Sequence, residues 1–320
     1  MNNNINITKM GKFPTLLVRE FYEHKTAFVT APAVIAGIIL IAIIAAMIGD
    51  GTNNIIVNGA RFDDATFFTE HLDADELDDL KRVISAGMIG VGGAILAILP
   101  FVVVFPLLNS LYEERIERSY LFWKSMPVSD LQEVLAKLVF IVGVGPFILF
   151  TIASALSLAT MIIVSPYMWF HDIPFVGVMW SQTPFISGWF GVAANYFVWA
   201  LWALPIFGWI LLASSYAPKA PLMFAVVPPV VIIVLENIFT RNTMLGEAIG
   251  SRLGQKFGGV MERVMDMERF TSHRVNFELP GLADATAALG ASLMDPSFWA
   301  GTAVAAAFIT GAVYIRRFRT

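Results

Sequence analysis

The sequence predicts an all-α integral membrane protein with six transmembrane helices. Of its 320 residues, 57% are hydrophobic and only 14% are charged, and the mean hydropathy is +0.70. Soluble domains average about 25% charged residues, so this chain has too little polar surface to fold in water. Apolar runs recur along it, each near the roughly 20 residues with which a helix crosses a bilayer. We therefore treat residues 1–320 as one transmembrane domain.

Residues 12–26 precede the first apolar run and are too polar to cross a membrane. Phe13, Leu16, Leu17 and Phe21 recur on one face of a helix, with charged and polar side chains opposite. This pattern is typical of an elbow helix that lies in the plane of the membrane interface. The alternative is a helical lead-in that continues directly into the first span.

The predicted spans place both chain termini on one side of the membrane, because an even number of crossings returns the chain to its starting side. Lys and Arg are enriched in cytoplasmic segments close to spans. Lys25 precedes the first span and Arg316 follows the last, so both termini are predicted to be cytoplasmic. The six predicted spans are residues 27–48, 83–108, 138–164, 185–213, 222–240 and 297–315.

Two of the predicted outer loops are long. Loop 49–82 is strongly acidic, but its carboxylates do not follow the spacing of a calcium-binding loop, which favours a solvated surface over a cation site. In loop 241–296, Leu245, Ile249 and Leu253 recur at helical spacing opposite charged residues. That loop is predicted to contain one or two amphipathic helices at the outer interface.

The fourth and fifth predicted spans contain the side chains best suited to a transported molecule. Aromatic rings such as Tyr196 and Trp199 could hold a cationic or flat amphipathic molecule, although packing against other helices explains them as well. Glu236 is an acid inside an apolar run, near the outer end of span five. There it either serves transport or reaches headgroups and water.

No catalytic motif is found in the sequence. It lacks the GxxxxGK[ST] loop that binds ATP phosphates, the HExxH zinc motif and the GxSxG nucleophile motif. Zero cysteines exclude disulfides and thiol catalysis, and a net charge of -4 without a sustained basic run argues against nucleic acid. We expect a protein that is not an enzyme and that binds no cofactor or metal itself.

The most unusual stretch is the charged loop 109–137, which lies between spans two and three and is predicted to be cytoplasmic. Its first part can extend span two as a helix, with Tyr112, Ile116 and Tyr120 along one stripe. A polar turn of a few residues would suffice to connect two spans. The length of this loop therefore suggests a surface that a partner contacts.

The second part of this loop contains a predicted turn and helix start. Pro127 disfavours helix at Met126. Ser129 then suits an N-cap, with Gln132 three residues later to complete a capping box. Asp130 sits favourably in the first turn because the helix dipole attracts negative charge there.

Residues 117–137, ERSYLFWKSMPVSDLQEVLAK, resemble a motif of the permease subunits of ABC-2 type exporters. The matching features are Glu117 with Arg118, a short helix at 123–126, then Pro127-Val128-Ser129, and finally Lys137. The layout is similar too, with an elbow helix, six spans, a cytoplasmic loop after span two and a long outer loop before span six. Many members carry Arg or Lys where this chain has Asp130.

The resemblance implies a half-transporter in the cytoplasmic (inner) membrane of a prokaryote. Two copies, or this chain and a homologous one, would pair within membrane lipids and bind two ABC ATP-binding subunits, which would hold ATP and Mg. The cargo would be hydrophobic or amphipathic, such as a drug, lipid or peptide. The implied ATPase-coupling residues are Tyr112, Glu113, Arg115, Ile116, Glu117, Arg118, Tyr120, Phe122, Trp123, Lys124, Pro127, Val128, Ser129 and Asp130, and the possible substrate pathway comprises Phe224, Val227, Glu236, Tyr196 and Trp199.

The alternatives are an ATPase-independent carrier, a membrane assembly factor or a membrane-embedded enzyme. A carrier would be expected to show ionisable residues or inverted repeats around a midplane site. Glu236 is the only such residue identified, and the two halves show no clear self-similarity. The absence of catalytic motifs makes the enzyme the weakest of these alternatives.

Overall fold

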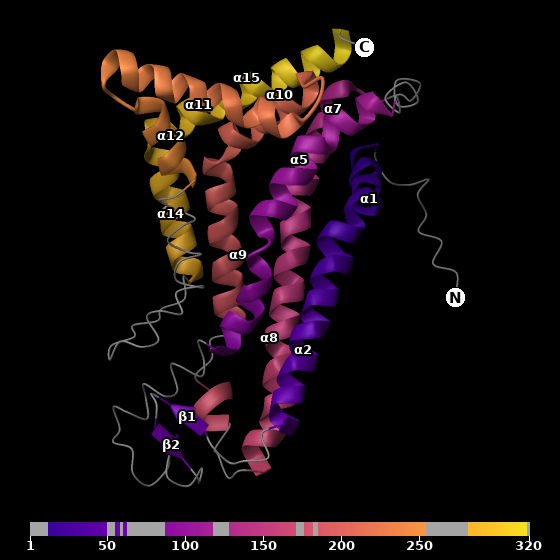
Figure 1. Cartoon of the computed structure of the whole chain (residues 1–320), viewed down its shortest axis with the longest axis vertical. Coiled ribbons are helices and arrows are strands. Elements are labelled where there is room, and N and C mark those ends of the chain that lie inside the picture. The colour runs from indigo at the N-terminus through magenta and orange to yellow at the C-terminus, as the bar shows by residue number, and fades with distance from the viewer. Residues whose placement is uncertain are drawn as a thin grey trace.

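The computed structural model of the protein is built almost entirely of helices (Figure 1). It describes residues 12–49, 55–57, 60–62, 87–117, 128–170, 176–181, 185–253 and 281–318. The α-helices are α1 (Lys12–Lys25), α2 (Ala31–Gly49), α5 (Leu99–Ile116), α7 (Asp130–Val139), α8 (Gly145–Phe170), α9 (Phe185–Trp202), α10 (Leu204–Tyr216), α11 (Pro221–Thr240), α12 (Met244–Leu253), α14 (Leu282–Met294) and α15 (Pro296–Phe318). Three π-helical turns are η2 (Thr26–Thr30), η3 (Phe140–Val144) and η4 (Val176–Trp180).

The described helices are compatible with the predicted multi-pass membrane protein. Five helical stretches are long and apolar enough to cross a membrane, and the count becomes six if the bent pair α9 and α10 forms one span. The small exception to the predicted all-α class is a hairpin in loop 49–82, in which β1 (Ile55–Val57) pairs antiparallel with β2 (Ala60–Phe62). The five stretches are Lys12–Ile48, Gly87–Ile116, Asp130–Phe170, Pro221–Thr240 and Pro296–Phe318.

The first helix is continuous where an interfacial elbow was predicted. α1 passes through η2 into α2, giving one helix of 37 residues, which is the arrangement of the alternative lead-in. One face of α1 packs against α7 and buries Leu16 and Glu20. Glu20 follows Leu16 by one helical turn, so a carboxylate lies on the face that the sequence assigned to membrane contact.

Two π-turns face each other where α2 meets α8. The ring of Phe28, in η2, is fully buried and lies 5.7 Å from the ring of Phe140, in η3. A Cβ atom on Gly145 would collide with the Phe28 ring, so glycine is what allows the two helices to approach this closely. Tyr196 of α9 donates a 3.1 Å hydrogen bond to the carbonyl of Val142, a residue of η3.

The predicted fourth span, 185–213, is broken into two helices. α9 and α10 meet at 62° around Ala203. Pro205 lies within the first two positions of α10, where it lacks an N–H and its ring disfavours continuation of the preceding helix. The guanidinium of Arg252 donates to the carbonyl of Trp202, the last residue of α9, at 2.9 Å, and to that of Ser297 at 2.8 Å. A side chain from α12 thus satisfies a backbone group exposed by the bend.

The remaining helices lie beside the bundle and across the end opposite the hairpin (Figure 1). α11 runs across one end of the bundle at a steep angle to α8 and α9, and most of its apolar side chains are exposed (Figure 1). Among the described residues of loop 241–296, α12 and α14 are helical, which agrees with the prediction of helix in this loop. α7, the start of α1 and the end of α15 lie together at the end of the bundle opposite the hairpin (Figure 1).

Candidate functional site: a buried ion network

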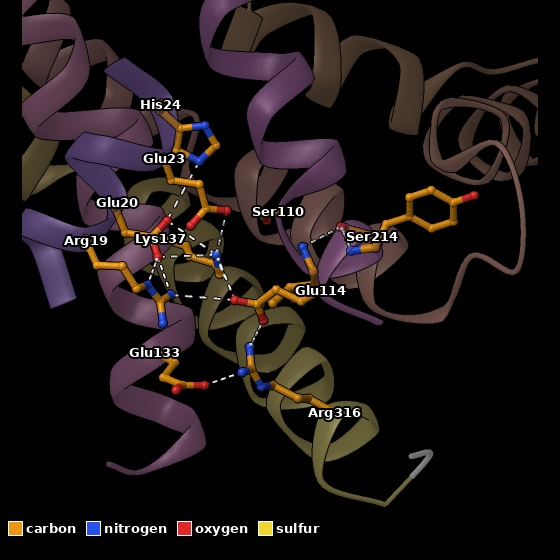
Figure 2. A network of polar contacts seen from close by, with 12 residues as sticks. Arg19, Glu20, Glu23, His24, Ser110, Glu114, Glu133, Lys137, Ser214 and Arg316 are labelled. Atoms are coloured by element: carbon orange, nitrogen blue, oxygen red, sulfur yellow. Dashed lines mark hydrogen bonds and ion pairs between the residues drawn. The ribbon is translucent and has the colours of Figure 1, made fainter. Parts of the chain in front are cut away.

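Charged side chains from four helices meet where α1, α5, α7 and α15 converge (Figure 2). These helices come from the two ends and the middle of the chain, so the site depends on tertiary structure. Burying charge in an apolar interior is costly unless each charge is paired. We define the ion network as Arg19, Glu20, Glu23, His24, Glu114, Asp130, Glu133, Lys137 and Arg316.

Lys137 is the central cation of the ion network. Its side chain is fully buried, as is that of Glu20. The Lys137 Nζ atom lies 3.2 Å from Glu20 Oε1 and 3.1 Å from Glu114 Oε1, with Glu23 Oε1 at 3.9 Å. The ammonium group therefore connects α7 to both α1 and α5, as Figure 2 shows.

Glu114 is the central anion of the ion network. One carboxylate oxygen contacts Lys137, while the other accepts a 2.8 Å hydrogen bond from Arg316 Nη1. The same Arg316 guanidinium pairs with Glu133 and lies 3.7 Å from Asp130. Arg19 Nη2 adds a 3.5 Å contact to Glu114. The C-terminal end of α15 is thus tied to α5 and α7 through one arginine.

Local sequence rules position the α7 side of the network. Ser129 is the N-cap of α7, and the capping box with Gln132 is present, with both hydrogen bonds at 3.3 Å. This confirms the prediction made from the sequence. With the helix start fixed, Glu133 and Lys137 are four residues apart and project from the same face toward the other helices.

Three residues of α1 have the residue types and spacing of metal ligands. Glu20, Glu23 and His24 place ligand atoms within 4.8 Å of one another. The Lys137 ammonium, however, already contacts both of these carboxylates. A metal ion at this point would be repelled by the ammonium charge. We therefore assign these side chains to the ion network and not to a metal centre.

A second polar contact lies beside the network and fixes α5 against α10. Arg115 donates hydrogen bonds to the carbonyls of Ser215, at 2.7 Å, and Ala217. Ser214 Oγ accepts from the backbone N–H groups of Leu111 and Tyr112, both at 3.1 Å. Carbonyls at a helix C-terminus lack partners within the helix, so Arg115 caps the end of α10.

The predicted ATPase-coupling residues differ in exposure, and some of them lie outside the described residues. Glu113, Ile116, Glu117 and Ser129 are exposed at the ends of α5 and α7, beside the loop that joins these helices. Tyr112, Arg115, Val128 and Asp130 are partly buried. The predictions for Arg118, Tyr120, Phe122, Trp123, Lys124 and Pro127 lie outside the described residues.

The predicted pathway residues lie on two helices and are held in different ways. On α9, Tyr196 and Trp199 are buried in the core, and the Trp199 indole donates to the carbonyl of Arg252 at 3.0 Å. On α11, the ring of Phe224 packs against Tyr216, and Val227 is exposed. The contacts of Tyr196 and Trp199 agree with the packing interpretation of the aromatic residues.

Glu236 has a structural contact that sequence reasoning missed. Its carboxylate accepts hydrogen bonds from the backbone N–H groups of Met244, at 3.1 Å, and Leu245, at 3.0 Å. These groups belong to the first turn of α12, where N–H groups lack helical partners and the dipole favours a negative charge. Glu236 therefore caps α12.

The side chain of Arg252, at the other end of α12, is the polar group that holds the break between α9 and α10. Its guanidinium lies 5.4 Å from the centre of the Trp202 ring. Burial lowers the pKa of the Arg252 guanidinium, and the nearby Asp295 carboxylate opposes this shift. The side chain stays charged, because an arginine guanidinium is effectively always protonated in proteins.

Sequence reasoning also missed most of the ion network. From the sequence, Arg316 was used only to predict that the C-terminus is cytoplasmic. Lys137 was named only as part of the motif that resembles ABC-2 permeases. A usable signal was present in α1 and α7, where Glu20 follows Leu16 by four residues and Lys137 follows Val134 by three. A charged residue on an apolar helical face is a sign of a buried pair.

Comparison with known proteins does not assign the chain to a family. No family model, curated protein or solved structure matches it. The fold and the ion network define a multi-pass helical membrane protein with a buried ionic junction at one end. Its function is inferred from these features.

Proposed function

We propose that this chain is the membrane-spanning subunit of an exporter of the ABC-2 type. ATP and Mg would be bound by separate ATP-binding subunits, and the chain would form the path for a hydrophobic or amphipathic cargo. One observation carries the proposal. Both helices that flank the loop 118–127, α5 and α7, contribute to the buried ion network, which also includes α1 and α15.

The network provides a way to transmit force from that loop. A partner that moves the loop would move the end of α5 and the start of α7 with it. Removing one partner from a buried ion pair costs about 3–5 kcal/mol, so the helices joined by Lys137 and Arg316 resist separation. α1 and α15 would then follow, and binding at the loop would shift the whole bundle between two arrangements.

The proposed assembly has two permease chains and two ATP-binding subunits in a prokaryotic inner membrane, with both termini in the cytoplasm. Two features support it. The beginning of α1 and the end of α15 lie at the same end of the bundle as α7 (Figure 1). α11 leaves apolar side chains such as Val230 and Ile238 exposed, and lipid or a second permease chain would cover them.

The alternative is an ATPase-independent carrier or assembly factor. A carrier needs ionisable groups along its transport path. In the part of the chain that the structure describes, the buried charges within candidate spans belong to the ion network at one end, and Glu236 caps α12. This distribution favours a mechanical junction over a proton or ion path.

The proposal is tested by purification of the chain and by one substitution. The isolated chain should hydrolyse no ATP. When it is purified gently from its source cells, a soluble ATPase should co-purify with it. Val128→Asp, just before the N-cap of α7, should abolish ATPase stimulation in the reconstituted complex while the protein still inserts. Asn242→Asp, in the exposed turn before α12, serves as the control. ATP hydrolysis by the isolated chain, or unchanged stimulation in Val128→Asp, would refute the proposal.

A further inference from the structure

Three helices approach one another closely at Gly92, within the helical stretch 87–96. A Cβ atom at this position would collide with the Ala153 carbonyl and with Ser157 Oγ, both on α8. It would also lie 2.7 Å from the Cζ2 atom of Trp189, on α9. Only glycine permits this approach, and it brings one hydroxyl and one indole edge to the same point.

Both polar groups at this point are buried without a partner. Ser157 is fully buried and Trp189 is 6% exposed. Ser157 Oγ and Trp189 Nε1 make no hydrogen bond in the described structure. Other buried polar groups on the same helices are paired, since Thr160 donates to the Leu156 carbonyl at 2.9 Å and Tyr196 to that of Val142. Two buried polar groups without hydrogen bonds, both next to the same glycine, are costly and call for an explanation.

The two groups together define the chemistry of a ligand. An indole nitrogen can only donate a hydrogen bond, and a serine hydroxyl can donate as well. A single group that satisfies both must accept from the indole, and an oxygen such as a carbonyl can accept from the hydroxyl as well. The surrounding core includes Ile89, Leu156 and Val192, all buried, so the rest of the ligand must be apolar.

We propose that Ser157 and Trp189 form a binding site for the cargo, which they recognise by a carbonyl or similar acceptor oxygen on an apolar molecule. This inference rests on the proposed transport function. In the described arrangement the helices are in contact at Gly92, so the ligand enters when the stretch 87–96 separates from α8 and α9. Because that separation frees two unpaired donors, a ligand that pairs with them selects the separated arrangement.

The first test uses the absence of cysteine from the sequence. Ser157→Cys introduces a single thiol of similar shape, and a water-soluble methanethiosulfonate reagent reacts with it only where water reaches. Thr160→Cys is the matched control, since Thr160 is on the same helix and 2% exposed but already paired. We expect reaction at position 157 to be at least about tenfold faster, because the thiolate that reacts needs hydration.

The same test uses benzophenone as the probe ligand, since it is an apolar ketone. Benzophenone should slow the reaction at position 157 by about threefold or more, by occupying the hydrated site. Equal reaction at both positions would show that the site never opens. Faster reaction at position 157 without protection would show a water site only. Either result would overturn the proposal.

A second test removes the indole donor and keeps the ring. Benzophenone attaches covalently to nearby C–H groups on irradiation, and Trp189→Phe should reduce attachment to α8 and α9 by about threefold, the loss expected for one hydrogen bond. Trp209→Phe is the control, because the Trp209 indole already donates to the Ala225 carbonyl at 2.8 Å. Equal attachment in both variants would overturn the proposal.

These tests separate the binding site from the proposed exporter function. Both use the purified chain without an ATPase, so they succeed or fail independently of coupling. If benzophenone binds at Ser157 and Trp189 but no ATPase associates, the exporter proposal fails and the site stands. If an ATPase is stimulated normally but the site does not bind the probe, only the site is refuted.

Discussion

Lys137 shows how one residue can determine the state of a whole junction. It is fully buried and has carboxylates from two other helices as partners. Its charge is tolerated only because those partners are present, and their charges depend on it in turn. A substitution that keeps the shape of this side chain but removes its charge should therefore lower the free energy of unfolding by a large amount.

The first prediction concerns this residue. Lys137→Met keeps the length of the side chain but removes the fully buried cation that contacts both Glu20 and Glu114. We expect the free energy of unfolding, measured in detergent by denaturant titration, to fall by about 3–5 kcal/mol. The double variant Lys137→Met with Glu20→Gln should recover part of this loss, because it removes one of the carboxylates whose charge the ammonium had balanced. A loss below about 1 kcal/mol, the usual worth of an exposed pair, would mean that water reaches the site.

At the scale of elements, the sequence predicts what is local and misses what is not. The start of α7 is predictable because Ser129 and Gln132 are three residues apart and satisfy each other's backbone. The spans are predictable because length and hydropathy define them. The bend between α9 and α10 is marked by Pro205, but the side chain that satisfies the Trp202 carbonyl at the bend is Arg252, which comes from another helix.

Which charges pair in the ion network could not be predicted, for the same reason. Glu20 and Lys137 are 117 residues apart, and no local pattern pairs them. The capping role of Glu236 likewise depends on the tight turn between α11 and α12, which brings its carboxylate under Met244 and Leu245. These contacts depend on how the helices pack against one another, and no local sequence pattern determines that packing.

A second prediction tests the contact between the facing π-turns. Gly145→Ala places a methyl group against the buried Phe28 ring and should lower the free energy of unfolding by about 1–3 kcal/mol, as overpacking does. Gly143→Ala is the control, because a Cβ there meets nothing within 4 Å. Alanine favours helix by up to about 1 kcal/mol over glycine, so this variant should be neutral or stabilising. Equal effects of the two variants in the same denaturant titration would contradict the described packing.

At the scale of the whole molecule, the junction joins parts of the chain that are far apart in sequence. α1 begins the described chain, α15 ends it, and α5 and α7 flank the loop 118–127. Arg316 contacts Glu114 and Glu133 at the same time, and so holds the last helix to the two that flank the loop. Under the proposed function, this residue connects the loop to the far end of the chain.

The third prediction concerns Arg316, because it contacts both helices that flank the loop. Arg316→Ala should reduce ATPase stimulation in the reconstituted complex by a coupling energy of about 0.5–2 kcal/mol, while association with the ATPase is retained. Arg317→Ala, at the next and exposed position, is the matched control and should have little effect. Similar behaviour of the two variants would show that the network does not transmit force. Loss of ATPase association in Arg316→Ala alone would show that it forms part of the docking surface.

The paired π-turns also limit how the helices can be altered or exchanged. Each helical residue rotates the chain by about 100°, and a π-turn accommodates one extra residue within a helix. η2 separates Glu20 from the apolar part of its helix, and η3 follows Lys137 on the other. Deleting one residue from the α-helical part between Glu20 and η2, where no extra residue is accommodated, would therefore turn the charged end of α1 by about 100° relative to α2. An insertion, deletion or chimaera in the α-helical parts beside the π-turns must keep the residue count, or the carboxylate and the ammonium will face different neighbours.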